Sequence, residues 1–199
     1  LYSELYFRNA KANDVRSKAI KTIFRALKNK NTSEEKYALR NRLGELYLEN
    51  AEYERNKAID TYNNRVEKWQ KTKKGKKPIY NEAKADLWTK RAIAIMQKNL
   101  KEFPKHPQND FLYFTIGFQY KDRDNKKSLK FLNTILKKYP YSSYRPDANL
   151  VIGEIYFDEN KYKSSQKYYL NAIKYKKSHV YLFSLYKLGW VFYNTKQYK

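Results

Sequence analysis

The chain has 199 residues, of which 41% are apolar and 17% aromatic, so it can build a sizeable core and disorder is an unfavourable interpretation. The absence of cysteine excludes disulfides, thiolate nucleophiles and sulfur-ligated metals, and no run of eighteen uncharged apolar residues offers a membrane-spanning helix. A formal charge of +23 would suit a polyanionic partner. The excess of basic residues is spread along the whole sequence, however, which favours a general bias in composition over a binding site.

The first 79 residues are predicted to be an N-terminal helical region. Apolar residues recur at helical spacing from residue 14 to residue 29, with Asp14 available as an N-cap. Thr32 and Glu35 then have the spacing of a capping box, which marks the start of a second helix. No helix breaker stands between Gly44 and Gly75, so this helix is expected to be long, with a turn near Asn50 as the alternative.

A basic loop is predicted at residues 71–78, because Gly75 and Pro78 interrupt the helical pattern there. An ordinary solvated loop is one interpretation of this segment. The other is contact with an anionic membrane surface, at roughly 1 kcal/mol per basic residue near such a surface. The lysines that would make that contact are Lys71, Lys73, Lys74, Lys76 and Lys77.

Residues 80–199 are predicted to contain helical repeats. A helix over residues 80–103 comes first, and then Gly117, Gly153 and Gly189 follow one another at steps of 36 residues. A constant step of this size is typical of supersecondary units that stack on copies of themselves. The expected units lie near residues 107–140 and 144–177, with a truncated one at 179–199. The fold class is therefore all-α, an α-solenoid of antiparallel helix pairs.

Each glycine belongs to the same short phrase, with an aliphatic residue before it and an aromatic residue three positions after it. A fourth copy stands upstream at Gly44. We expect the glycines to let paired helices approach closely and the rings to fill the space between units. The residues predicted to pack the repeats are Gly44, Gly117, Gly153, Gly189, Tyr120, Tyr156 and Phe192.

This pattern resembles the tetratricopeptide repeat (TPR). The unit with Ile152, Gly153, Tyr156, Ser165 and Tyr169 has the aliphatic-glycine-aromatic phrase in its first helix and a small residue followed by an aromatic in its second. The resemblance covers residues 107–199. It departs from the family in its period of 36 rather than about 34, and in lacking the usual early tryptophan of the first helix.

A narrower likeness begins at Tyr139-Pro140-Tyr141 and continues through Pro146-Asp147-Ala148. It resembles TPR proteins of bacterial cell envelopes, namely the outer-membrane assembly lipoproteins and the repeat proteins associated with gliding motility. This resemblance implies a bacterial cell-envelope location, periplasmic or outer-membrane associated, with the cytoplasm as the alternative.

The family resemblance implies a binding groove on the inner wall, formed by the first helix of each repeat. Its positions in this sequence are unusually aromatic, which suits a protein partner bound as a peptide or a helix. In the alternative interpretation, the N-terminal helices or further repeats cover these rings. The predicted groove residues are Phe111, Phe114, Phe118, Lys121, Leu150, Glu154, Phe157, Tyr186, Trp190 and Tyr193.

Nothing in the sequence indicates an enzyme. His106 and His179 have no acidic partner at helical spacing, so both are interpreted as loop residues, and no cofactor, metal or small-molecule substrate is expected. The runner-up function is a nucleic-acid-binding helical repeat that uses the basic surface, because lysines are concentrated in the second helices. The favoured function is a non-enzymatic scaffold for protein–protein interaction.

Overall fold

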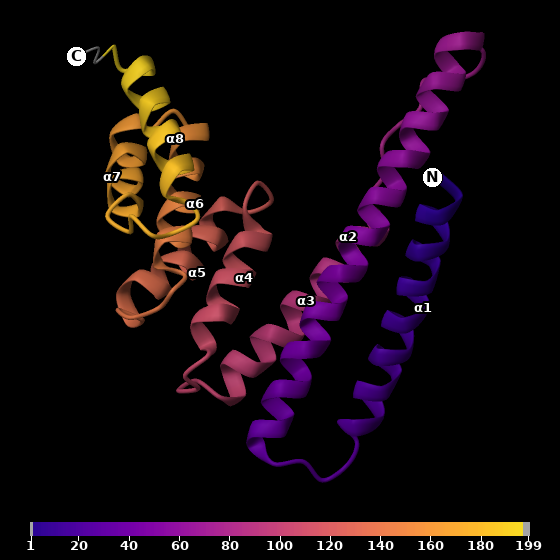
Figure 1. Cartoon of the computed structure of the whole chain (residues 1–199), viewed down its shortest axis with the longest axis horizontal. Coiled ribbons are helices and arrows are strands. Elements are labelled where there is room, and N and C mark those ends of the chain that lie inside the picture. The colour runs from indigo at the N-terminus through magenta and orange to yellow at the C-terminus, as the bar shows by residue number, and fades with distance from the viewer. Residues whose placement is uncertain (1, 197–199) are drawn as a thin grey trace. The chain divides into compact units, whose positions relative to one another are not determined.

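The computed structural model describes residues 2–196, and the side chains of residues 12–196. Within this range it contains eight helices and no strand, so the predicted all-α class is confirmed (Figure 1). The chain forms two compact units, of which the first ends at Pro104 and the second begins at Lys105. The division therefore falls after the helix predicted at residues 80–103, not before it.

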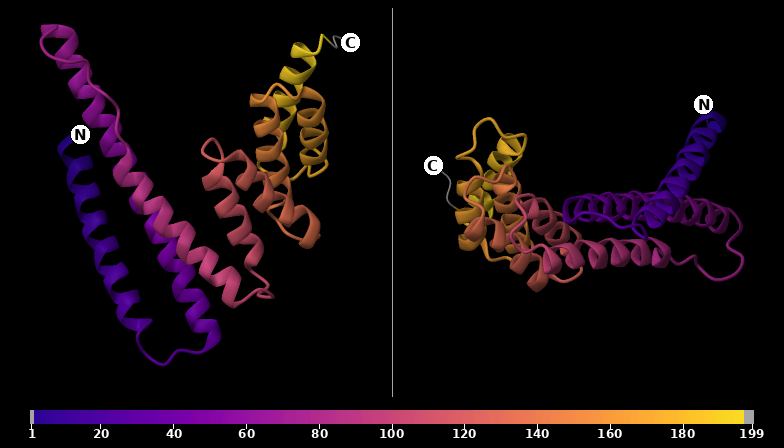
Figure 2. Two further views of the ribbon diagram at one scale, coloured as in Figure 1. Left: turned by 180° about the vertical axis from the view of Figure 1, so that it is seen from behind. Right: turned by 90° about the horizontal axis from the view of Figure 1, so that it is seen from below.

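The first unit is built around one long helix. α1 (Tyr2–Ala26) and α3 (Ala83–Glu102) both pack against α2 (Ser33–Thr72), as Figures 1 and 2 show. Packing of α3 on α2 is the most extensive contact between helices in this unit, which is why α3 belongs to it. The shared core contains Ile23, Leu43, Leu46, Tyr47 and Ala92.

Two helix boundaries differ from the sequence prediction. α1 begins at Tyr2 rather than near residue 14, and Asp14 lies inside the helix, where it pairs with Lys18 at 2.7 Å instead of acting as an N-cap. α2 runs unbroken through Asn50, so the alternative turn is wrong. The buried residues of α2 all lie between Tyr37 and Ala51, so its second half has partly buried side chains, such as Tyr62, but no fully buried one.

The capping box of α2 forms as predicted. The Thr32 hydroxyl accepts a hydrogen bond from the Glu35 backbone N–H at 3.2 Å, and the Glu35 carboxylate accepts one from the Thr32 N–H at 2.8 Å. The backbone N–H of Thr32 and its hydroxyl both donate to the Glu35 carboxylate, and these two bonds lower the pKa of Glu35 because they favour the ionised form. The helix start is therefore defined by the local sequence.

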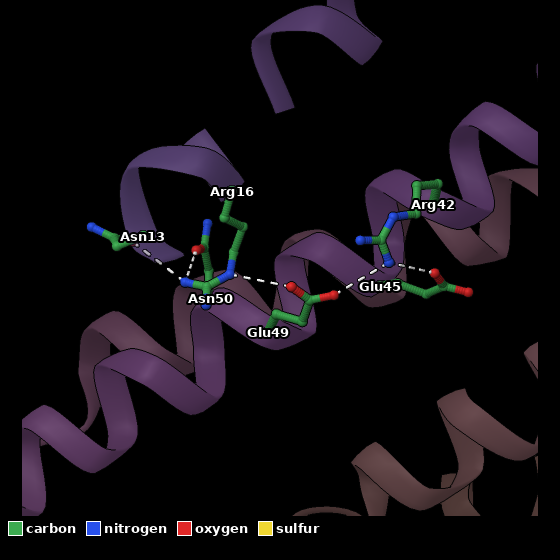
Figure 3. Close-up of polar contacts among 6 residues, drawn as sticks. All are labelled: Asn13, Arg16, Arg42, Glu45, Glu49 and Asn50. Carbon is green, nitrogen blue, oxygen red and sulfur yellow. Dashed lines mark hydrogen bonds and ion pairs between the residues drawn. The ribbon is translucent and has the colours of Figure 1, made fainter. Parts of the chain in front are cut away.

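Arg16 joins α1 to α2. Its guanidinium reaches from α1 to the Glu49 carboxylate at 3.3 Å and the Asn50 side-chain oxygen at 3.0 Å (Figure 3). Glu49 also accepts a hydrogen bond from Arg42 at 3.2 Å, within α2. Asn50 is thus buried within an unbroken helix, and its side-chain oxygen accepts a hydrogen bond from Arg16 of α1.

The basic loop predicted at residues 71–78 begins at Lys73, because α2 continues to Thr72. Lys73 and Gly75 both have positive φ, at 52° and 79°, and the ammonium of Lys73 lies 4.6 Å from the centre of the Trp69 ring. Lys71 belongs to the last turn of α2 and pairs with Glu67 at 2.6 Å. All five lysines are exposed.

The second unit contains two helix pairs and one further helix. They are α4 (Asn109–Tyr120) with α5 (Asn125–Lys138), α6 (Arg145–Asp158) with α7 (Tyr162–Ala172), and α8 (Tyr181–Asn194), which packs on α7 and α6. The first residues of α4, α6 and α8 keep the 36-residue step of the glycines. We refer to α4, α6 and α8 as the A helices and to α5 and α7 as the B helices.

Three of the four repeated glycines lie where two helices approach closely. A Cβ atom at Gly44, Gly117 or Gly153 would lie 2.8, 2.8 or 2.6 Å from a side-chain atom of the following helix. The side chains that fill these positions are Met96, Leu132 and Tyr169. Gly189 differs, because a Cβ there would meet no atom within 4 Å among the described residues.

The aromatic residue three positions after each glycine packs beside the same contact. Tyr120 stacks on Phe131 with ring centres 6.0 Å apart, and Tyr156 stacks on Tyr168 at 5.6 Å. Phe192, the corresponding residue of α8, packs against the core cluster that contains Leu188 and Val191. In α4 and α6, the glycine and the ring together therefore define how the A helix packs against the B helix that follows it.

Candidate protein-binding face

The charges of the second unit are separated between the two kinds of helix. The A helices carry two basic and four acidic residues, a net charge of −2, whereas the B helices carry seven lysines and no acidic residue. The A helices thus lack the excess of positive charge that dominates the composition. Their exposed face is instead apolar and aromatic.

The exposed rings gather on α8. Phe183, Tyr186, Trp190 and Tyr193 are spaced by three or four residues, which places them on one side of the helix. Successive ring centres along this row lie 6.1, 6.2 and 5.7 Å apart. Tyr186 is 59% exposed and Trp190 is 44% exposed. With Phe118 of α4, which is also exposed, these residues make up what we call the aromatic face.

A row of charged side chains crosses the three A helices. Glu154 of α6 pairs with Lys121, which follows α4, at 3.7 Å and with Lys187 of α8 at 3.4 Å. All three side chains are about four-fifths buried. The Lys187 ammonium also lies 4.8 Å from the centre of the Phe157 ring. These contacts show that the three helices present one continuous face, and that its charges are already paired.

Three predicted groove residues are covered by neighbours, one of them fully and two in part. Leu150 is only 9% exposed and packs with Tyr169 and Val180 in the core, because α7 and α8 close over it. Phe114 stacks on Tyr144 at 5.2 Å, and Phe111 contacts the same ring at 6.0 Å. Leu150 is therefore a core residue and not part of a groove.

An open pocket of about 1030 Å³ lies beside Phe114, at the N-terminal ends of α6 and α8. His179 Nε2 lies 2.9 Å from an Asp147 carboxylate oxygen at its wall. The sequence offers His179 no acidic partner at helical spacing, and the structure supplies one from 32 residues away. His179 itself lies between α7 and α8, as the prediction of a loop residue expected. Three lysines contribute to the lining of the pocket, namely Lys174, Lys176 and Lys177.

Asp147 is mostly buried, and burial raises the pKa of its carboxyl group, an effect that His179 partly offsets. The ionised form is then less favourable in the folded chain than in the unfolded chain, so this group lowers stability as the pH rises through its raised pKa. We expect Asp147→Asn to increase the free energy of unfolding at pH 7 by less than about 1 kcal/mol, and to leave it unchanged at pH 3.

Urea unfolding at both pH values measures this effect, with His179→Gln as the control that removes only the partner. A loss of stability in Asp147→Asn at pH 7 would show that pairing with His179 outweighs burial, contrary to the expectation.

Comparisons with known proteins add no family assignment. A scan against protein-family models gives no match, and a sequence search of curated proteins gives none either. Across residues 2–196, no helix is both long enough and apolar enough to cross a membrane. Among the side chains of residues 12–196, no three from His, Asp or Glu come together as a metal site would require.

Proposed function

We propose that the chain is a non-enzymatic scaffold that binds a protein partner on the aromatic face. The observation that carries this proposal is the row of exposed rings on α8. Tyrosine and tryptophan are the residues that most often dominate the energetics of protein–protein interfaces, because they bury a large area and lose little conformational entropy. Phe118 extends the same apolar character to α4.

The electrostatics of the A helices support a partner that is not a polyanion. Lys187 is the one lysine within α4, α6 and α8, and it pairs with Glu154. Lys121, which follows α4, pairs with Asp122 and Glu154. A nucleic-acid site would instead need basic side chains that are free to neutralise phosphates. A peptide or helix whose apolar residues cover the rings fits this face better.

A second candidate function rests on the B helices. Their seven lysines without an acidic neighbour on the same helices could bind nucleic acid. Binding of a labelled oligonucleotide across a salt series separates the two candidates. Nanomolar affinity at physiological salt with a steep salt slope would favour the nucleic-acid function.

We also propose a repeat family and a cellular location for the chain. The 36-residue step of the A helices and the glycine contacts are compatible with an α-solenoid of the TPR type. From the likeness of residues 139–148 to envelope proteins of that type, we propose a cell-envelope role, periplasmic or outer-membrane associated, in a motility-related or envelope-maintenance assembly. The exposed loop lysines would allow contact with an anionic membrane surface.

Crosslinking pull-down from native membranes tests the proposed face. We expect Tyr186→Ala and Trp190→Ala each to reduce recovery of the partner, with a loss of affinity of about 30-fold for a central interface ring, equivalent to about 2 kcal/mol. Tyr141→Ala is the matched control, since Tyr141 is a fully exposed ring that lies outside the face. Equal recovery by all three variants would refute the proposal.

A further inference from the structure

The Gly189 surface of α8 is a second exposed surface, distinct from the aromatic face. It consists of Leu182, Leu185, Gly189 and Phe192, which share one side of the helix. Leu182 is 75% exposed and Leu185 is 38% exposed. A Cβ atom added at Gly189 would meet open space among the described residues.

The same surface is covered on the three other helices that carry the glycine phrase. Residues equivalent to Leu185 stand four positions before each glycine, and two of them, Arg40 and Asn149, are buried. The third, Tyr113, is half-buried and contacts Phe131 of the following helix at 6.1 Å. Only on α8 is the position exposed. The surface is therefore built like a helix–helix contact but has no helix on it within residues 2–196.

The three covered copies share one pattern in the helix that covers them. In each, a small residue is followed four positions later by the bulky apolar residue that fills the space at the glycine. The pairs are Ala92 with Met96, Ser128 with Leu132, and Ser165 with Tyr169. All six residues are at most 1% exposed.

Each residue of a pair has a physical role. The small residue lets the two backbones approach, and in α5 the Ser128 hydroxyl also donates a hydrogen bond to the Gly117 carbonyl oxygen at 2.7 Å. The bulky residue occupies the volume that the missing glycine side chain leaves free. Leu132, Tyr169 and Met96 differ in shape, so the position accepts either an aliphatic or an aromatic side chain.

We propose that the Gly189 surface binds an α-helix of a partner protein that presents a small residue and, four residues later, a bulky apolar residue. A folded second copy of this chain cannot supply the three pairs described above, since each is already buried in its own molecule. The partner helix continues the row of helix pairs. This interaction is independent of the aromatic face.

The probe is a labelled synthetic peptide with the sequence of residues 159–177, which contains the Ser165 and Tyr169 pair. Fluorescence anisotropy with the whole chain measures its binding. We expect Gly189→Leu to weaken binding at least tenfold, because the added side chain fills the space, and not to lower the melting temperature, because it meets no neighbour among the described residues. A peptide with alanine in place of Tyr169 should also bind at least tenfold more weakly.

Phe118→Ala is the control for the aromatic face, and it should leave peptide binding unchanged. The proposal is overturned if the wild-type chain does not bind the peptide, or if Gly189→Leu binds it as tightly as the wild type. It is also overturned if sedimentation shows that the chain dimerises without peptide and that Gly189→Leu abolishes the dimer, because a second copy would then be the occupant.

Discussion

Gly153→Leu is expected to reduce the stability of the second unit by about 3 kcal/mol. A Cβ at this position would lie 2.6 and 2.7 Å from two carbons of the Tyr169 ring, which is fully buried between α6 and its neighbours. A rigid ring in a close-packed core cannot move aside as a flexible side chain could. Leucine adds three more carbons to the same space, so α6 and α7 must separate.

Hydrogen exchange measured peptide by peptide is the appropriate assay, because it assigns the loss of protection to α6 and α7 rather than to the other unit. Gly189→Leu is the matched control, with the same substitution in the same phrase. It removes a helix-interior glycine without creating a clash, so it should be neutral or stabilise α8 by up to about 1 kcal/mol. Equal destabilisation by the two substitutions would contradict the packing argument.

Asn99→Asp is expected to reduce the stability of the first unit by about 3 kcal/mol at pH 7. Asn99 is fully buried, and its side-chain amide donates to the Tyr37 carbonyl oxygen at 2.9 Å and to the Asn41 side-chain oxygen at 2.7 Å. An aspartate has the same shape but no N–H groups. It would place a buried carboxylate against two acceptor oxygens, at the contact between α3 and α2.

The pH dependence identifies the cause of this loss. Burial would raise the pKa of the introduced carboxyl group, so the penalty is complete above that pKa and fades as the pH falls toward the unfolded value of about 3.9. Urea unfolding followed from pH 7 to pH 4 measures the change, with Asn64→Asp on the exposed surface of α2 as the control. A loss that does not depend on pH would show that charge is not its cause.

The features of the fold that were predicted best are those that depend on residues close together in the sequence. The Thr32 and Glu35 pair fixed the start of α2 because both hydrogen bonds are made within four residues. The glycine step predicted the 36-residue spacing of the A helices. The start of α1 was missed because Asp14 offered an N-cap, although Tyr2, Leu5 and Tyr6 upstream already have helical spacing. The hydrogen bond from Arg16 to Asn50 joins two helices, so the local sequence around Asn50 does not reveal it.

The residues of the candidate site were harder to predict from the sequence than the helices. Whether a side chain is exposed depends on which other helices pack over it. Leu150 and Tyr186 occupy equivalent positions, 36 residues apart, yet Leu150 is buried and Tyr186 is exposed. The difference arises because α7 and α8 pack over α6, whereas no described helix packs over that side of α8. Periodicity gives the position within a repeat but not the neighbours that a given repeat has.

The buried residues of α2 lie far along the helix from the lysines of the basic loop. From Ala51, the last buried residue, to Thr72 the helix rises about 30 Å at 1.5 Å per residue. Mobile ions screen charges over about 8 Å at physiological ionic strength. The lysines beyond Thr72 thus stand several screening lengths from the apolar cluster around Leu43 and Ala92. The mutual repulsion of these lysines acts at the C-terminal end of α2. Charges can therefore be added or removed in this loop with little effect on the packing of α2 against α3.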